Sequence, residues 1–450
     1  MGLHLTQFLP FVIYFVSFVV AFLSIAVNPA VGVLFLFPLL PYQIIFEKIK
    51  LLPLGKDIND IIIFCILIGF IFRTAGSREN RVTSNTFSKK KTGLHLPIML
   101  LVIANVIGFL NATSSYGLAL DLTNNYILDL KNYMLLPLIW FLTYKIIKSK
   151  KMLKLITYLM VIGILGADYY FYTNLQWMNV WHFSERTRVM MDGLFVYLGA
   201  NHYGAFFAHF VFILIGIFLF DKSKVRKIIL LGIISFTTYC LMYSFSRGAY
   251  IAFIAGLLFI GFLKERRILL LLLFFLLSWR SLVPISVYER VKMTKNDEGE
   301  LEESAAIRIV LWNQAISMFK ESPLIGKGFN TFQFTYKDRL WKDTHNFYLK
   351  MLVELGLFGL GAFLFLLYRA FLLGWKLYRE ADDRFLRGLG LGFSACVIST
   401  AITNAFGDRW SYLSLGSYFW IFLGIVTCAR VNNMAEPLKP QRIKPSLKQP

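Results

Sequence analysis

The sequence has few charged side chains for its length. Only 16% of its 450 residues are Asp, Glu, Lys or Arg, and 57% are hydrophobic, whereas about a quarter of the residues in soluble domains are charged. So small a polar complement cannot cover soluble domains, and apolar runs of about 20 residues recur along the chain. The scarcity of charge therefore excludes a soluble protein and predicts an all-α polytopic membrane protein.

Acidic residues are fewer than basic residues. The chain has 26 Asp and Glu against 47 Lys and Arg, a formal net charge of +21. In a soluble protein this excess would suggest a nucleic-acid partner, but membrane loops beside anionic headgroups carry the same excess. We therefore expect membrane lipids as partners and no nucleic acid.

Patterns typical of metal sites, disulfides and targeting signals are also missing. The four cysteines lie in or beside apolar runs without CxxC spacing, which favours packing roles: Cys65, Cys240, Cys396 and Cys428. No D-x-D motif occurs in the outer loops described below, and the acidic run at 297–303 reads as a solvated face, so we expect no metal and no cofactor. The start, MGLHLTQFLP, lacks a basic stretch and no A-x-A site follows, which predicts no cleavable signal.

Thirteen apolar runs are candidate membrane spans. They cover residues 8–27, 30–46, 58–72, 96–112, 132–148, 155–171, 198–220, 228–245, 249–263, 268–283, 346–372, 388–405 and 412–429. Either the N-terminus lies outside, or the run at 30–46, which Pro38 and Pro41 interrupt, is re-entrant, so that twelve spans remain and both chain ends lie inside. We expect about twelve spans (12–13), with both ends inside.

Charge bias assigns the two sides of the membrane. Alternation of the runs from residue 96 onward places the basic segments on one side, which the positive-inside rule identifies as the cytoplasm. These segments are 73–91, 148–154, 221–227, 264–267, 374–387 and the proline-rich tail. We expect residues 1–430 to form a single transmembrane domain and residues 431–450 to form a disordered cytoplasmic tail.

The outer side receives the loops 113–131, 172–197 and 284–345 and the turns 246–248 and 407–411. A connection of roughly 60 residues is far longer than a helix bundle needs, and such loops are usually functional or disordered. Residues 307–319 have apolar side chains at helical spacing, and turn signals follow in SPLIGKGFNT. The 284–345 loop is therefore predicted to be partly helical, and the site is expected on this side.

Arginines on the outer side run against the positive-inside rule. Eight of them fall there: Arg186, Arg188, Arg247, Arg280, Arg290, Arg308, Arg339 and Arg409. Any single one fits snorkelling or interfacial anchoring. Several that converge on one pocket would suit a diphosphate, because the guanidinium fork matches phosphate oxygens. Arg247 is the clearest candidate, since it lies in the short FSRGAY turn, although a tight turn with an interfacial Arg is the alternative.

His345 lies where the long loop re-enters the membrane, next to Asp343 and Asn346. It is a candidate general base or phosphate contact, and the alternative is that it caps the following helix. Glu354 is a weaker candidate acid, because it falls near the opposite face of that helix. An i, i+4 pair with Lys350 is the expected role of Glu354.

Four segments in one order resemble the O-antigen ligase/polymerase superfamily of bacterial membrane glycosyltransferases. They are FSRGAY (245–250), AAIRIVLW (305–312), PLIGKGF (323–329) and HNFYLKMLVELGLFGL (345–360). A weaker likeness involves Arg188, Gly193, Asn201 and Ala205. The resemblance covers roughly residues 185–365, whereas the N-terminal spans agree only in hydropathy.

The resemblance implies a multi-pass enzyme of the bacterial inner membrane whose active site faces the periplasm. It implies transfer of a glycan from an undecaprenyl-diphosphate carrier to an acceptor sugar of lipid A-core or of another glycan, without a metal. By motif, Arg308 and Arg247 would hold the diphosphate, with Arg188 as a further contact, and His345 would serve the acceptor hydroxyl. Whether Asp343 orients His345 stays open.

Two other functions remain as alternatives. A polymerase of the same superfamily would use the same residues but would extend a carrier-linked repeat. A secondary transporter for an anionic solute would place polar residues near the midplane of two corresponding halves. Here the polar residues gather in one asymmetric outer loop instead, which favours an enzyme, and among enzymes we favour the ligase.

Overall fold

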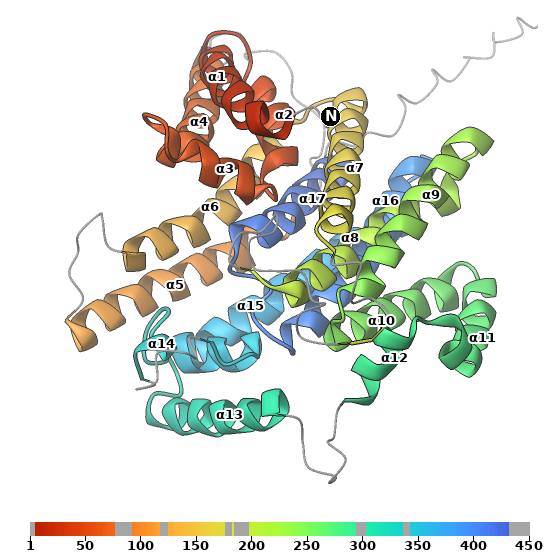
Figure 1. The fold of residues 1–450 in the computed structure, drawn as a ribbon. Coiled ribbons are helices and arrows are strands. Elements are labelled where there is room, and N and C mark those ends of the chain that lie inside the picture. Colours follow the sequence, from red (N-terminus) through yellow and green to blue (C-terminus); the bar gives the residue numbers. More distant parts are fainter. Residues whose placement is uncertain are drawn as a thin grey trace, which may run out of the picture.

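The computed structural model describes residues 5–76, 92–117, 125–175, 182–183, 198–293, 303–335 and 343–431. All regular structure in these residues is helical (Figure 1), so the all-α prediction is confirmed. The helices are α1 (Leu5–Ala26), α2 (Pro29–Leu39), α3 (Gln43–Ile49), the short 3-10 helix η1 (Gly55–Asp57), α4 (Ile58–Gly76), α5 (His95–Tyr116), α6 (Asn125–Ile146), α7 (Lys150–Thr173), α8 (Ala200–Phe220), α9 (Lys224–Tyr243), α10 (Arg247–Leu263), α11 (Arg267–Leu282), α12 (Ile285–Lys292), α13 (Glu303–Glu321), α14 (Phe332–Thr335), α15 (Phe347–Glu380), α16 (Arg384–Asn404) and α17 (Leu413–Val431).

The chain is a polytopic membrane protein. Within the described residues, nine helices are long and apolar enough to cross a membrane. The number rises to 11 if each of two bent pairs, α2 with α3 and α11 with α12, is one span. The remaining two of the predicted runs form α6 and α10. Each predicted run is thus helical, while the number of about twelve spans stays a prediction.

The basic segments meet at one end of the bundle. Lys150 Nζ lies 2.6 Å from Asp383 Oδ2, and Arg430 Nη1 lies 2.7 Å from Glu380 Oε2. The Lys264 ammonium lies 4.9 Å from the centre of the Phe220 ring. We call this end, near residues 76, 146, 220, 263, 380 and 431, the basic face. The opposite end, near residues 116, 173, 243, 282, 347 and 404, is the loop face.

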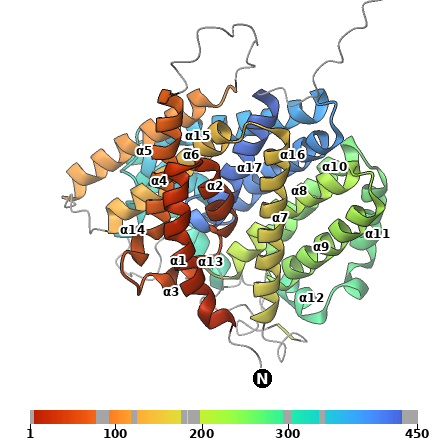
Figure 2. The same ribbon diagram turned by 90° about the horizontal axis from the view of Figure 1, so that it is seen from above.

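The start of α1 lies at the loop face. The Tyr14 hydroxyl donates to Pro53 O at 2.8 Å, just before α4, and a Cβ on Gly69 late in α4 would lie 2.0 Å from Ser24 O late in α1. The two helices are therefore parallel, and Figure 2 shows α1 beginning opposite the end where α4 stops. The prediction that both chain ends lie on one side is wrong. The pair α2–α3, although bent by 108°, carries the chain back between two parallel helices.

The C-terminal helices form the core behind the loop face. Helices α8 and α17 are almost wholly enclosed, whereas α4 and α9 expose apolar side chains at the periphery. Glycines let α8 and α16 approach closely, as a Cβ on Gly216 would lie 2.2 Å from Gly388 O. Small residues at helix contacts are typical of membrane interiors. This tight packing fixes the ends of α8 and α16, from which site residues project.

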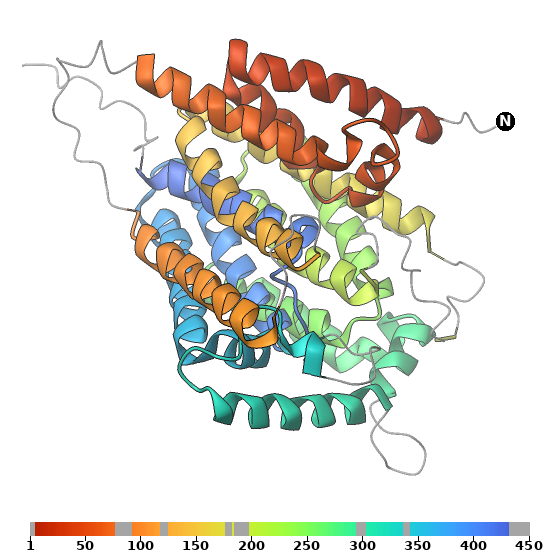
Figure 3. The same cartoon turned by 90° about the vertical axis from the view of Figure 1, so that its left-hand side faces the viewer.

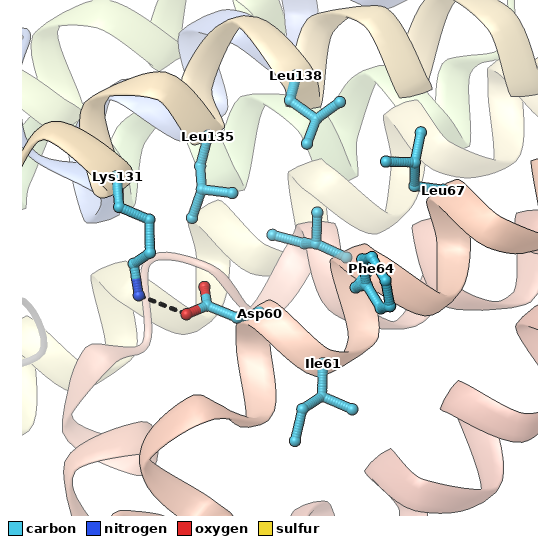
Figure 4. A pocket seen from close by; sticks show the side chains of 8 residues that line it. Asp60, Ile61, Phe64, Leu67, Lys131, Leu135 and Leu138 are labelled. Atoms are coloured by element: carbon cyan, nitrogen blue, oxygen red, sulfur yellow. Dashed lines mark hydrogen bonds and ion pairs between the residues drawn. The ribbon is translucent and has the colours of Figure 1, made fainter. Parts of the chain in front are cut away.

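A pocket opens between α4 and α6, away from these ends (Figure 4). Its walls are mainly apolar, with Phe64, Leu67 and Leu135 among the lining side chains, and Lys131 pairs with Asp60 at its edge. None of its lining residues is a predicted site residue. This pocket therefore does not mark the candidate site.

Candidate functional site

Helix α13 carries Arg308 toward the start of α15. The indole Nε1 of Trp312 donates to Thr344 O at 3.0 Å, which ties α13 to the residue before His345. Leu311 and Met318 of α13 pack in one cluster with Val353 of α15, and Figure 3 shows α13 in full length along the edge of the bundle. Because residues four apart share a helix face, Arg308 lies on the same face as Trp312. The predicted partly helical loop is thus confirmed.

His345 is not the cap of α15. Asn346 is the N-cap, because its Oδ1 accepts from Tyr348 N at 3.0 Å and from Leu349 N at 3.3 Å. His345 itself has a left-handed backbone conformation, with φ of 50°. Such a conformation in a residue other than glycine costs about 1–3 kcal/mol and is concentrated at functional sites. The capping alternative for His345 is therefore wrong, and its strained position directs attention to its side chain.

The surroundings of His345 favour a neutral imidazole. Burial lowers the pKa of His345, and the charges of Arg308 and Arg409 lower it further, while Asp343 opposes them. A neutral ring nitrogen can accept a proton from a hydroxyl group at neutral pH. The electrostatic environment thus suits a general base.

The sequence left open whether Asp343 orients His345, and the hydrogen bond of Asp343 in the described structure goes elsewhere. Its Oδ2 accepts from Asp408 N at 3.4 Å, and its buried Oδ1 has no hydrogen-bond partner among the described residues. Asp343 therefore joins the start of α15 to the turn that follows α16. Its influence on His345 is electrostatic.

Asp408 organises that turn. Its Oδ1 accepts from Trp410 N at 3.0 Å and from Ser411 N at 2.9 Å, and its Oδ2 accepts from Lys350 Nζ at 2.9 Å. Burial alone would raise the pKa of Asp408, but Lys350 and the Ser411 backbone hold it below its usual value. Lys350 thus forms its ion pair with this turn, and it acts on Glu354, the predicted partner, through charge alone.

Arg409, which sequence reasoning named only among the outer arginines, belongs to the same cluster. Its Nη1 donates to His202 Nε2 at 2.7 Å and to Asp408 O at 3.0 Å. Its charge and that of Arg308 both act on His345. The only sequence signal for this placement was an arginine in an outer turn. His209, about two turns further along the same face of α8, instead contacts Thr403 Oγ1 at 2.7 Å.

The PLIGKGF and ELGLFGL segments lie against each other at a break in α15. Helix α15 is broken at Gly356, which has φ of 64°. Lys327 N and Gly328 N donate to Val353 O and Glu354 O at 2.7 and 2.9 Å. On the other side of the break, the amides of residues 357 and 358 donate to Pro323 O and Leu324 O at 2.8 and 3.1 Å.

Residues 323–328 thus satisfy the backbone groups that the break leaves without helical partners. The same segment follows α13 directly. The insertion therefore fixes the position of α13, with Arg308, relative to the first turns of α15, beside His345.

Arg247 is the first residue of α10, at the loop face. Its Nη1 donates to Met293 O at 3.3 Å, at the C-terminal end of α12. Gly248 allows a close approach to the turn after α16, since a Cβ there would lie 2.8 Å from Phe406 Cβ. Phe245, just before the turn, has φ of 52°. The FSRGAY turn is therefore strained and packed beside the segment that carries Arg409.

Other predicted site residues cannot be placed. Arg188, Arg186 and Arg339 lie outside the described residues, as do residues 297–302 of the acidic run. Among the described residues, Arg308, His345 and Arg409 come together at the loop face, and Arg247 occupies the adjoining turn. Such a group can bind an anion and remove a proton from a neighbouring hydroxyl.

A family model described as O-antigen ligase matches residues 228–364. Residues 228–364 are thus similar to O-antigen ligases. The match includes the FSRGAY turn, Arg308, the 323–329 insertion and His345, so the resemblance to the O-antigen ligase/polymerase superfamily is confirmed. Arg188 and Arg409 lie outside the matched segment. A comparison with curated protein sequences finds no match to the chain.

The matched segment indicates the class of chemistry. The family comprises glycosyltransferase-like enzymes of lipopolysaccharide biosynthesis, and the match supports an O-antigen ligase/polymerase-type function for this chain. The described residues of the matched segment run from α9 into α15. Helices α8, α16 and α17, outside it, supply the buried support and the turn with Arg409.

Proposed function

We propose that this protein is an inner-membrane glycosyltransferase. It transfers a polysaccharide from undecaprenyl diphosphate to an acceptor sugar of lipid A-core on the periplasmic side. The observation that carries the proposal is the cluster of His345, Arg308 and Arg409, tied together at the loop face by Trp312 and Asp408. Residues 1–430 act as one transmembrane domain, with 431–450 as a cytoplasmic tail.

His345 is the proposed general base. The acceptor hydroxyl oxygen forms a bond to the anomeric carbon, and its proton passes to an imidazole nitrogen of His345. The bond between the anomeric carbon and the phosphate oxygen breaks, and both bonding electrons leave with the lipid diphosphate. General-base catalysis of this kind typically contributes about 10²–10⁴-fold.

Arg308 and Arg247 are the proposed diphosphate contacts, with Arg188 as a further one. Negative charge grows on the leaving phosphates as the glycosidic bond breaks, and guanidinium groups positioned there stabilise it. Other glycosyltransferases use a divalent cation for this purpose, and we propose that arginines replace it here. The proximity of Arg308 to His345 supports this division of roles.

Comparison of glycans from a null mutant tests the proposal against the polymerase alternative. Loss of a ligase leaves long chains on the lipid carrier and an acceptor without them. Loss of a polymerase leaves single repeats transferred to the acceptor. Normal long-chain glycan on the acceptor in the null mutant would contradict both.

A further inference from the structure

Arg409 is a buried cation in the turn between α16 and α17. Only 8% of its surface is exposed. Its Nη1 contacts His202 Nε2 and donates to Asp408 O, and its Nε and Nη2 groups donate to no described residue. Two donor groups of a buried guanidinium are therefore available in the described structure.

The charge of Arg409 has no carboxylate within ion-pair distance among the described residues. Asp408, its neighbour in the chain, is already paired with Lys350 and with two backbone amides. Asp343 acts on Arg409 through its charge, without a hydrogen bond between the two side chains. A buried charge without a direct counter-ion is strongly unfavourable, which indicates that an anion is its intended partner.

The guanidinium is held in place from several sides. The ring of Tyr412 packs edge-on against His202 with a centroid distance of 5.1 Å, which supports the acceptor of Nη1. Gly407 passes so close that a Cβ there would lie 2.8 Å from Nη2. A preorganised guanidinium loses little entropy when it binds phosphate, as expected for a binding residue.

Arg409 also faces the proposed catalytic residues. Its charge and that of Arg308 both act on His345, and Arg308 acts on Arg409. The two arginines come from different elements, α13 and the turn after α16. Both charges therefore act at the start of α15, on His345.

We propose that Arg409 is a third phosphate-binding residue, which contacts the diphosphate of the lipid carrier through Nε and Nη2. This inference rests on the proposed function, because it assigns one more contact to the same donor. It extends the site beyond the segment that matches the ligase family. His202 becomes a positioning residue that fixes Arg409.

Binding of undecaprenyl diphosphate to the purified full-length protein in nanodiscs tests this inference. Arg409→Gln removes the charge but keeps a polar side chain, and it should weaken binding about ten- to hundredfold. Arg409→Lys should restore binding only in part, because an ammonium lacks the planar fork. The matched control is Arg430→Gln, which removes a guanidinium paired with Glu380 at the basic face and should leave affinity unchanged.

Two further measurements separate the possible outcomes. They are the thermal stability of each variant and the binding of the lipid diphosphate to Arg308→Gln. If Arg409→Gln lowers stability while the folded protein binds the lipid diphosphate as tightly as wild type, Arg409 is structural and the inference is wrong. If Arg308→Gln weakens binding and Arg409→Gln does not, this inference fails alone. If neither variant weakens binding, the proposed diphosphate site fails as well.

Discussion

At the residue scale, His345 and Asn346 are neighbours with different roles. The sequence predicted that one polar residue at this position would cap α15, and it offered His345 as a candidate. The structure gives the cap to Asn346, whose side chain accepts from two amides of the first turn. His345 contributes its imidazole to the charged cluster instead. Neighbouring polar residues cannot be separated from sequence alone, because the backbone angles decide which side chain turns toward the helix.

Asn346→Ala should destabilise the protein by about 1 kcal/mol, as the loss of an N-cap typically does. Turnover per folded molecule should stay near that of the wild type if His345 keeps its position. Thermal unfolding and activity measured on the same preparation check this. A wild-type melting temperature would show that the cap contributes nothing.

The pH dependence of kcat/KM should reflect His345. Burial and the charges of Arg308 and Arg409 lower its pKa, so the imidazole stays neutral through neutral pH. Protonation removes the base only at lower pH, and kcat/KM should fall there with a midpoint below about 6.5, the usual pKa of histidine. Arg308→Gln removes one positive charge and should move the midpoint to higher pH.

The control for this profile is Arg430→Gln, at the opposite face, which should leave the midpoint unchanged. An Arg308→Gln profile identical in midpoint to the wild type would contradict the electrostatic role of Arg308.

Arg308 and His345 were both predicted from motifs. Arg409 was not assigned a role, because a turn far along the chain joins the site only through tertiary packing.

At the element scale, the break in α15 is the feature that sequence reasoning missed. Turn signals in SPLIGKGFNT and the glycines of ELGLFGL were visible, but each reads alone as a local feature. Only the fold brings residues 323–328 into the break at Gly356 and pairs four backbone groups there. The run at 346–372 was therefore predicted as one uninterrupted span.

Gly356→Ala should destabilise the protein by more than about 2 kcal/mol. The Gly356 backbone, with φ of 64° and ψ of −165°, is essentially restricted to glycine and costs about 1–3 kcal/mol in a residue with a Cβ. Here that Cβ would also lie 2.3 Å from Leu324 O. Activity should fall with stability, because the insertion sets the distance between α13 and α15. A thermal-shift assay of the purified variant measures the first effect.

Gly361→Ala, in the same helix, is the matched control. A Cβ there meets nothing within 4 Å, so this variant should be neutral or slightly stabilising, since alanine favours helices by about 0.5–1 kcal/mol over glycine. Equal melting temperatures for the two variants would contradict the role of the break.

At the scale of the whole molecule, hydropathy predicted each apolar helix and charge predicted which ends lie together. Both predictions succeed because insertion into the bilayer depends on the hydropathy and the flanking charges of each segment, which are local properties of the sequence. The side on which α1 begins was predicted wrongly, because a bent pair of short helices such as α2–α3 has the same composition whether it crosses the bilayer or turns back. Contacts of Tyr14 and Gly69 decide it.

Cysteine labelling tests the assignment of the two faces. Lys292 at the loop face and Lys222 at the basic face are both exposed. In a variant without the four native cysteines, Lys292→Cys should react with a membrane-impermeant maleimide in cells whose outer membrane is permeabilised. Lys222→Cys should react only after lysis. The reverse pattern would place the site on the cytoplasmic side and contradict the proposed function.

The central claim is that His345 acts on the acceptor hydroxyl while arginines hold the carrier diphosphate. The most direct test is the single-turnover rate of glycan transfer by purified His345→Ala protein saturated with lipid-linked donor, with carrier affinity measured on the same sample. We predict near wild-type affinity and melting temperature, with a rate lowered by about 10²–10⁴-fold. A wild-type transfer rate in the folded His345→Ala protein would contradict the account.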